Sequence, residues 1–489
     1  MNESENLKNK TIGGFIWRFA ERCGAQIVSF VVSIILARLL EPEAYGTIAL
    51  VNVFITILSV FVNSGMGSAL IQKKDADDLD FSSVFYFNVF MCVALYVLMF
   101  LCAPLIADFY DKSELISLVR VISLSLIIYG VNGIQTAYVS KHMLFKRFFF
   151  STLGGTIASA LIGIAMAYKG FGVWALVTQS LSNSAINTVI LWATVKWRPK
   201  LMFSFKRLKG LFSFGWKMLV SGLLDTAYNQ LRSLIIGKKY SSADLAYYDK
   251  ANSFPNVIIN NVNSSIDSVL LPSMASVQDH KEAVKGMTRR AIKTSTYVMA
   301  PLLMGLAFCG QPLISLLLTD KWLPSYPYMV IFCITYMFYP VHTANLNAIK
   351  AMGRSDLFLK LEICKKIVGL TALLITMNIS VMAMSYSLLF TSVLSQIINS
   401  WPNKKLMNYS YLEQLKDILP GILLAVFMGG CVWTVTLLKL SPIVTLIIQV
   451  PLGAAIYIGL SALFKMESFT YCLSIVKPII KKIFKKHTF

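Results

Sequence analysis

The sequence is poor in charged residues. Only 14% of its 489 residues are Asp, Glu, Lys or Arg, whereas 56% are hydrophobic. A soluble globular domain carries about 25% charged residues, so a water-soluble protein is excluded. Long apolar runs fill most of the chain, and the polar stretches between them are short. We therefore expect a protein that lies almost wholly within a membrane.

The sequence also lacks the motifs of several kinds of site. Its eight cysteines are scattered without a C-x-x-C spacing, and all but Cys472 lie in apolar segments. We interpret them as packing residues and expect no metal site or disulfide framework. Neither a G-x-x-x-x-G-K-[ST] phosphate loop nor a soluble domain to hold a nucleotide is present, so no cofactor is expected. The first apolar segment is too long for a signal peptide, so we expect it to remain as a helix.

The apolar runs predict an all-α polytopic membrane protein with about 14 transmembrane helices. A spanning helix needs about 20 mostly apolar residues. The predicted spans are 12–39, 45–70, 81–107, 115–139, 149–168, 172–195, 209–237, 245–274, 290–318, 326–350, 357–377, 379–401, 418–439 and 443–464. The turns near Lys169 and Asn378 are very short.

Lysine and arginine gather in alternate connections between these spans and in the C-terminal segment. Cytoplasmic loops carry such an excess, so we place both termini in the cytoplasm. The net charge of +21 therefore reflects topology and does not indicate nucleic-acid binding, because the charges do not form one patch. Residues 465–489 include "SIVKPIIKKIFKKHTF", with isoleucines on one helical face and lysines on the other. We expect an interfacial helix there; a frayed basic end is the alternative.

Two parts of the chain resemble each other at an offset of about 200 residues. The segment "GFIWRF" matches "SFGWKM", which aligns Trp17 with Trp216 and Arg18 with Lys217, and Asn52 aligns with Asn252. Because the repeat holds an even number of spans, we predict two parallel six-helix lobes around a central cavity. The predicted domains are 1–200 and 201–410 for the lobes, 411–464 for two additional transmembrane helices, and 465–489 for the basic amphipathic tail.

Polar residues form stripes on four of the predicted spans. Positions three and four apart share a helical face, and a charge at the centre of a spanning helix costs about 2.5–3.5 kcal/mol. The stripes are Arg18, Glu21 and Arg22; Asn52, Thr56 and Asn63; Lys217, Asp225 and Arg232; and Asp249, Asn252, Asn256, Asn260, Asn263 and Asp267. Their equivalence in the two lobes predicts that they face one polar cavity.

Each stripe also has a structural interpretation. Arg18 and Arg22 are near enough to the predicted cytoplasmic surface to extend their charges toward it, and Glu21 could simply pair with Arg18. The asparagines could hydrogen-bond between helices without any cavity. Asp225 could pair with Arg232 as part of the structure.

The cationic character of the cavity predicts an anionic substrate. The guanidinium fork of arginine matches the geometry of a phosphate group, and asparagine and serine suit hydroxyl-rich groups. We therefore predict that a diphosphate binds Arg18, Arg22, Lys217 and Arg232. A glycan is predicted to contact Asn52, Asn63, Asn252, Asn256, Asn260 and Asn263, and ion coupling is assigned to Asp225, Asp249 and Asp267.

Four motifs resemble those of the Wzx-type polysaccharide transporters of the multidrug/oligosaccharidyl-lipid/polysaccharide (MOP) exporter superfamily. They are "LLEPEAYGTIAL", "ADLAYYDKA", "SVLLPSMASVQD" and "LLLTDKWLPSYP". The resemblance implies a flippase of the bacterial cytoplasmic membrane. Such a protein moves an undecaprenyl-diphosphate-linked oligosaccharide to the outer leaflet by alternating access, for surface polysaccharide such as the O-antigen of lipopolysaccharide, and can meet polysaccharide assembly proteins. Glu41 and Ala246 stand where the family usually has Gly, and both departures fall in turns.

Two other functions remain open from the sequence. A drug or cation exporter of the same superfamily would need an acidic, aromatic cavity, against which Arg18, Arg22, Lys217 and Arg232 argue. A membrane polymerase or glycosyltransferase of the same pathway would need sizeable outer loops, and here those loops are a few residues long. We therefore do not expect an enzyme.

Overall fold

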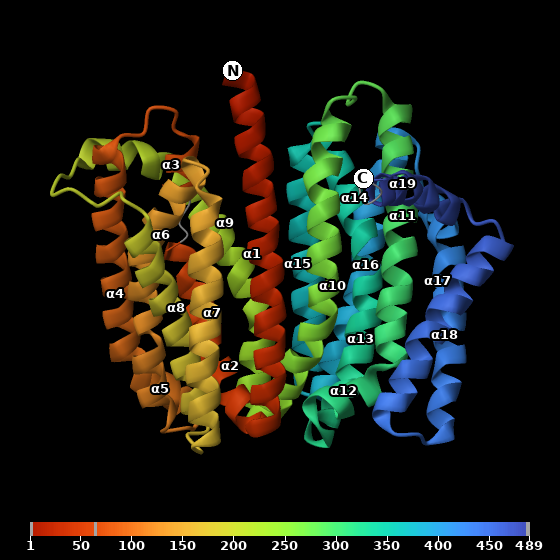
Figure 1. Ribbon diagram of the computed structural model, residues 1–489, viewed down its shortest axis with the longest axis horizontal. Coiled ribbons are helices and arrows are strands. Elements are labelled where there is room, and N and C mark those ends of the chain that lie inside the picture. The colour runs from red at the N-terminus through yellow and green to blue at the C-terminus, as the bar shows by residue number, and fades with distance from the viewer. Residues whose placement is uncertain (1–2, 63–65, 486–489) are drawn as a thin grey trace. The chain divides into compact units, whose positions relative to one another are not determined.

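The computed structural model describes residues 3–62 and 66–485, and all the regular elements in these residues are helices (Figure 1). The helices are α1 (Glu3–Leu39), α2 (Pro42–Val62), α3 (Met66–Gln72), α4 (Asp78–Tyr110), α5 (Leu115–Ile122), α6 (Leu124–Lys141), α7 (Phe145–Tyr168), α8 (Val173–Thr194), α9 (Phe205–Lys239), α10 (Ser242–Ala275), α11 (Lys281–Phe308), α12 (Gly310–Leu318), α13 (Tyr326–Met337), α14 (Tyr339–Ala351), α15 (Ser355–Thr376), α16 (Val381–Met407), α17 (Tyr411–Thr434), α18 (Pro442–Leu463) and α19 (Glu467–Lys485), with short 3-10 turns at Asp320–Ser325 and Val435–Leu438. The prediction of an all-α fold is confirmed.

Most of the predicted membrane spans coincide with long apolar helices. Ten helical segments of the described residues are long and apolar enough to cross a membrane. Helices α8, α9, α10 and α15 occupy the other four predicted spans, but they are not among these ten. The protein is a multi-pass membrane protein, and the count of fourteen spans stays a prediction.

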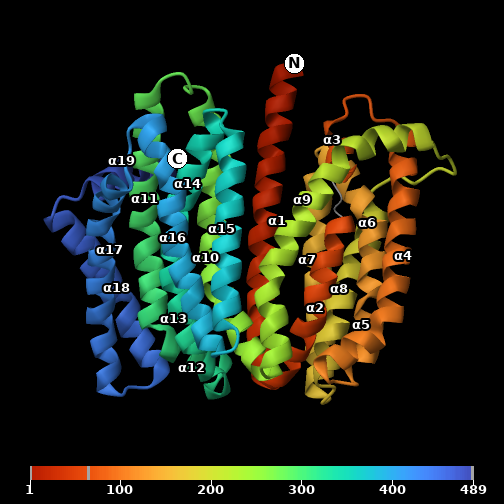
Figure 2. The ribbon, with the colours of Figure 1, turned by 180° about the vertical axis from the view of Figure 1, so that it is seen from behind.

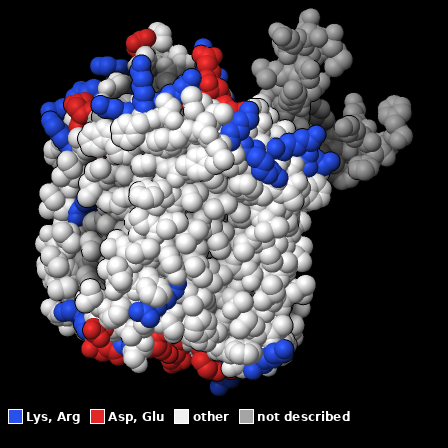
Figure 3. Space-filling model, turned by 90° about the vertical axis from the view of Figure 1, so that its left-hand side faces the viewer, with Lys and Arg blue, Asp and Glu red and all other residues white. Residues whose placement is uncertain are grey.

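Figure 3 shows one face of the molecule, seen from the side on which α4 lies in Figure 1. Charged side chains gather at the two ends of this face and leave a broad band between them almost free of charge. A band of this kind is what a hydrocarbon environment requires, because unpaired charges are costly there.

The chain divides into two compact units, which we call unit 1 (Met1–Ala246) and unit 2 (Tyr247–Phe489). In unit 1, α7 packs against α1 and α8, and α4 packs against α6. Helix α9 packs against α2, α3 and α4 and therefore belongs to unit 1 (Figures 1 and 2). The predicted lobes were defined by the internal repeat of the sequence, whereas these two units are defined by packing. The predicted division at residue 200 therefore stays a prediction.

The core of unit 1 has two parts. Phe81, Phe85 and Trp197 pack with Met66 and Leu70 where α3, α4, α6 and α8 meet. A second cluster joins Val32 and Leu36 of α1, and Leu40 directly after it, to the alanines of α7 and α8. The small alanine side chains let these three helices approach closely, as in other membrane helix bundles.

In unit 2, α11 is the central helix. It packs along α17 and also contacts α13 and α14, while α15 packs against α16 (Figure 2). Helix α18 packs against α17, and α19 contacts α11 and α18. The predicted helix in the C-terminal segment is thus present over Glu467–Lys485.

The approach of α2 to the start of α10 predicts a strong requirement for glycine. A Cβ atom at Gly46 would lie 1.8 Å from the carbonyl oxygen of Ser242, which is backbone and cannot turn aside. We expect Gly46→Ala to lower the free energy of unfolding by about 1–3 kcal/mol, because the two segments must separate. Thermal unfolding of the purified variant in detergent measures this loss.

Gly210→Ala is the matched control, since a Cβ atom at Gly210 meets nothing within 4 Å. Alanine there should leave the protein unchanged or stabilise it by about 0.4–1 kcal/mol. Equal midpoints for the two variants would show that the contact between α2 and α10 is not tight.

Candidate functional site

Arg18 on α1 is half-buried and has an acidic partner on the same helix. Its Nη1 lies 2.6 Å from Oε2 of Glu21, and its guanidinium carbon lies 4.6 Å from the centre of the Phe148 ring. Thr152 of α7 donates a hydrogen bond of 3.0 Å to Oε1 of Glu21. Glu21 is 7% exposed, so Arg18 supplies the charge that this buried carboxylate needs. The structure therefore supports a packing role for Arg18 in joining α1 to α7.

Arg22 lies one turn further along α1 and differs from Arg18 in its surroundings. Its side chain is exposed, and within residues 3–62 and 66–485 it forms no hydrogen bond or ion pair. All its donors are thus available to a ligand. Of the two predicted diphosphate ligands on α1, Arg22 is the one with a free guanidinium group.

The remaining predicted residues of unit 1 lie on α2 and α9. Asn52 is exposed on α2, whereas Asn63 lies outside the described residues. On α9, Asp225 is exposed and accepts a hydrogen bond of 3.3 Å from Nδ2 of Asn229. Arg232 is half-buried on the same helix, and the side chain of Lys217 lies outside the part of the chain that the structure describes. Their assignment to the diphosphate and to ion coupling stays a prediction.

The polar stripe of α10 is partly used by neighbouring helices of unit 2. Asn252 Oδ1 accepts a hydrogen bond of 2.7 Å from the hydroxyl group of Tyr336 on α13. On α14, the Thr343 hydroxyl donates to Oδ1 of Asn263 at 2.7 Å. The same helix presents Asn347, whose Nδ2 donates to Oδ1 of Asp267 at 2.8 Å. Three positions of the stripe therefore make the interhelical hydrogen bonds that were the alternative to a cavity.

The other positions of this stripe have different environments. Asn256 and Asp249 are half-buried, and Asn260 is exposed. The Nδ2 groups of Asn252 and Asn263 form no hydrogen bond among the described residues. Donors for a glycan therefore remain on α10 even where the oxygen atoms are used.

Sequence reasoning missed a buried polar network in unit 2. Asn345 of α14, Asn403 of α16 and Gln414 of α17 are all fully buried. Asn403 Nδ2 donates to Oδ1 of Asn345 at 2.6 Å, and Gln414 Nε2 donates to the same atom at 3.0 Å. In return, Nδ2 of Asn345 donates to Oε1 of Gln414 at 2.8 Å. The network joins three helices. Each helix supplies only a few of its residues, so these residues form no periodic pattern in the sequence that would have predicted the network.

A cluster of ion pairs lies at one end of unit 1, around the start of α4. Asp80 is fully buried and lies 2.6 Å from Nζ of Lys73, and Asp77 lies 2.7 Å from Nη1 of Arg207. The backbone N–H of Asp80 and the Arg207 guanidinium hold the pKa of Asp77 below its ordinary value. Lys73 and Arg207 were used in the sequence analysis only to orient the spans. In the structure they also connect α3 and α9 to the start of α4.

The sequence is similar to proteins of polysaccharide biosynthesis. The family described as "Polysaccharide biosynthesis protein" matches residues 35–327. The teichuronic acid biosynthesis protein TuaB of Bacillus subtilis is 25% identical over 89% of this chain and 91% of its own length. The lipopolysaccharide biosynthesis protein WzxC of Escherichia coli is 21% identical over 85% of this chain and 82% of its own. The succinoglycan biosynthesis transport protein ExoT of Rhizobium meliloti is 24% identical over 64% of this chain and 63% of its own.

Solved structures share the fold at lower identity. The lipid II flippase MurJ in its inward closed conformation has a TM-score of 0.72 and 15% identity, over 92% of this chain and 98% of its own. An inward-facing MATE multidrug resistance transporter of the MOP superfamily has a TM-score of 0.57 and 14% identity, over 78% of this chain and 94% of its own. The family match covers more than half of the chain. The chain therefore belongs to the polysaccharide biosynthesis protein family and has the fold of the MOP transporters, as its motifs predicted.

Proposed function

We propose that this protein is a flippase that moves a polyprenyl-diphosphate-linked oligosaccharide from the inner to the outer leaflet of the bacterial cytoplasmic membrane. The main support is the membership of a polysaccharide biosynthesis family together with a helical fold like that of a lipid II flippase. Both termini are proposed to lie in the cytoplasm, so a reporter fused after Phe489 should report from that side.

Arg22 is the residue that we propose as the main ligand of the substrate diphosphate. Its free guanidinium group matches a phosphate group in charge and geometry. We propose that Arg22, Lys217 and Arg232 bind the diphosphate, while Arg18 orients α1 through Glu21. Asn52, Asn256 and the amide groups of Asn252 and Asn263 are proposed to bind the hydroxyl groups of the glycan. The polyprenyl chain stays in the hydrocarbon of the membrane.

A reconstituted transport assay tests the proposed function. The purified chain is placed in liposomes that carry a fluorescent polyprenyl-diphosphate-linked oligosaccharide, and an impermeant quencher reports the fraction of label in the outer leaflet. We expect the protein to speed the exchange of label between leaflets well above that of protein-free liposomes. A cationic dye in the same liposomes tests the drug exporter. Transport of the dye and no movement of the glycolipid would contradict the proposal.

The three acidic residues predict how transport is driven. We propose that at least one of Asp225, Asp249 and Asp267 takes up a proton or a sodium ion during the cycle, because charged groups in spanning helices commonly mark ion pathways. Asn at that position should remove the stimulation of transport by an imposed gradient and leave basal exchange. Asp267 already accepts a hydrogen bond from Asn347. If all three Asn variants keep the full response to both gradients, these residues are structural.

A further inference from the structure

The connection between α8 and α9 projects from unit 1 beyond α4 in both ribbon views (Figures 1 and 2). With the first residues of α9 it has the sequence "KWRPKLMFSFKRLK", which we call the 196–209 segment. Three of its apolar side chains are exposed, Leu201 to 98%, Phe203 to 52% and Phe205 to 71%. Exposed apolar groups that lie together commonly mark a surface that contacts a membrane or another protein. The proposed transport site uses none of these residues.

Hydrogen bonds hold the 196–209 segment against the start of α4. The backbone N–H of Lys200 donates to Oγ of Ser82 at 3.0 Å, and that of Ser204 donates to Oγ of Ser83 at 2.9 Å. Nζ of Lys200 also lies 2.6 Å from Oδ2 of Asp78. The exposed apolar side chains therefore belong to a segment whose backbone is bound to a helix that is apolar enough to span a membrane.

Burial alternates along the middle of the segment. Leu201, Phe203 and Phe205 are exposed, whereas Met202 and Ser204 between them are half-buried. Ser204 has an extended backbone, with φ −131° and ψ 108°, and side chains two residues apart share a face where the chain is extended. The three exposed apolar side chains therefore form one face, which the described residues of the protein leave largely uncovered.

The contacts with α4 also give the level of this face in the membrane. Helix α4 begins at Asp78, and Ser82 and Ser83 follow within its second turn. At 1.5 Å per residue they lie about 6–8 Å along the helix from its start. Interfacial apolar groups enter the boundary between headgroups and acyl chains to a depth of about 5–10 Å. The segment thus lies where the charged end of unit 1 gives way to the uncharged band of Figure 3.

Lysines without partners accompany the apolar face. Lys196, Lys206 and Lys209 are exposed, and they form no ion pair or hydrogen bond within residues 3–62 and 66–485. Lys200 and Arg207 differ from them, because both pair with acidic residues at the start of α4. An apolar face in a segment with unpaired lysines is typical of chains that lie in the surface of an anionic membrane.

We infer that the 196–209 segment is a lipid anchor for unit 1, in the leaflet on the side where α4 begins. Its three exposed apolar side chains enter the boundary between headgroups and acyl chains, and its three unpaired lysines contact anionic phospholipid headgroups. A lipid leaflet supplies the apolar layer and the negative charge together, at the level where the segment lies. Because α9 begins within the segment, the anchor sets the level at which α9 enters the membrane.

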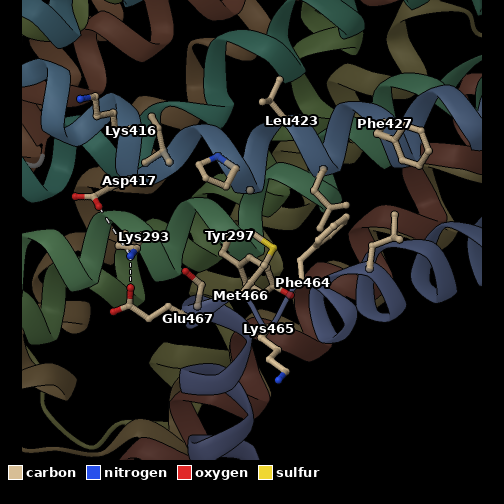
Figure 4. Close-up of a pocket in the computed structure, with 16 residues that line it drawn as sticks. Lys293, Tyr297, Lys416, Asp417, Leu423, Phe427, Phe464, Lys465, Met466 and Glu467 are labelled. Carbon is tan, nitrogen blue, oxygen red and sulfur yellow. Dashed lines mark hydrogen bonds and ion pairs between the residues drawn. The ribbon is translucent and has the colours of Figure 1, made fainter.

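Unit 2 attaches its own surface helix in a comparable way. Glu467 is in the first turn of α19, the helix that the sequence predicts to be interfacial, and it forms an ion pair with Lys293 of α11 (Figure 4). Lys293 also lies 3.9 Å from Asp417 of α17. In unit 1, the ion pair of Lys200 with Asp78 connects the 196–209 segment to α4. Each unit would therefore have a basic segment that an ion pair fastens to its helices.

Fluorine relaxation in lipid nanodiscs tests this inference. Phe203 of the full-length protein is replaced by 4-fluorophenylalanine, in discs of phosphatidylglycerol and phosphatidylcholine in equal amounts. A nitroxide near the lipid headgroup should relax this fluorine at least about threefold more than a nitroxide at the end of the acyl chain. Phe90 is the control position, because it is 71% exposed in the middle of α4 and should show the opposite order. In the variant Leu201→Ser/Phe205→Ser, a gadolinium chelate in water should relax the Phe203 fluorine more strongly than in the wild type.

The charge of the lipid is tested with the same fluorine at Phe203. A nitroxide carried by phosphatidylglycerol should relax it roughly threefold more than one carried by phosphatidylcholine, because lysines near the surface attract anionic lipids. The variant Lys196→Gln/Lys206→Gln/Lys209→Gln should bring this ratio close to one. The control is Lys404→Gln/Lys405→Gln, which changes two exposed lysines of α16 and should keep the wild-type ratio.

Three results would overturn the inference. Strong relaxation of the wild-type fluorine by the chelate in water, with none from the shallow nitroxide, would place the segment outside the lipid. Relaxation by neither probe would mean that a second copy of the chain covers it. An equal effect of the two labelled lipids in the wild-type protein would show that anionic headgroups are not selected.

Discussion

Replacing Arg22 with alanine is expected to stop glycolipid transport and to leave the protein folded in the membrane. The side chain is exposed and has no ion pair among the described residues, so its loss leaves no buried charge. A charge-assisted hydrogen bond contributes about 1.5–3 kcal/mol, and a diphosphate that loses two of them should be moved at least about a hundredfold more slowly. Exchange of labelled glycolipid, divided by the amount of folded protein, measures the effect.

Arg22→Lys should recover part of this loss, because a lysine keeps the charge but not the planar fork. If Arg22 only extends its charge to the membrane surface, Arg22→Ala will keep its transport rate per folded molecule. That result would remove Arg22 from the proposed mechanism.

Arg18→Ala provides the contrast on the same helix. It leaves Glu21, whose side chain is 9% exposed, without its cation. Breaking a buried pair costs about 3–5 kcal/mol, and because Arg18 is itself 37% exposed we expect about 1–3 kcal/mol here. The variant should therefore lose stability more than transport, and the double variant Arg18→Met/Glu21→Gln should regain part of that stability.

The helices could be predicted closely from apolar run lengths and turn residues. The predicted turn after residue 168 is present, since α7 ends at Tyr168 and the connection to α8 holds Gly170 and Gly172, both with positive φ angles. The count of spans could not be predicted from composition for a physical reason. Helices α9 and α10 carry polar stripes and α15 carries charges within the span, so composition alone does not distinguish them from surface helices.

The polar site was harder to predict because periodicity shows which residues share a face and not what that face meets. The polar stripe of α10 was predicted to face a cavity, and three of its residues, Asn252, Asn263 and Asp267, form hydrogen bonds with α13 and α14. The same limit applies to Arg18 and Arg22, which share one face of α1. Only the position of α7 gives one of them a packing role, because Thr152 fixes Glu21 beside Arg18.

Replacing Asn345 with leucine is expected to cause the largest loss of stability among these variants. Its side chain exchanges hydrogen bonds with Asn403 and Gln414, and all three residues are fully buried. Leucine has a similar size but removes Oδ1, the acceptor that both partners share. Asn403 Nδ2 then keeps only a long contact of 3.4 Å to the backbone oxygen of Asn345, and Gln414 Nε2 keeps only one of 3.5 Å to the backbone oxygen of Tyr409. Each poorly paired buried group costs about 1–3 kcal/mol. For the two groups together we expect the free energy of unfolding to fall by about 2–6 kcal/mol, a large part of the 5–15 kcal/mol that is usual for a folded protein.

A double-mutant cycle with Gln414→Leu tests whether the network acts as a unit. Each single variant leaves the other residue, Gln414 or Asn345, without its hydrogen-bond partner. The double variant Asn345→Leu/Gln414→Leu removes both partners of the shared hydrogen bonds. Its loss should therefore be smaller than the sum of the single losses by at least about 1 kcal/mol. Unfolding in detergent with increasing denaturant measures all four proteins. Simple additivity would mean that Asn345 and Gln414 are satisfied independently. In either case, transport per folded molecule below the unfolding temperature should stay near the wild-type rate, because the network contains none of the residues proposed to bind substrate.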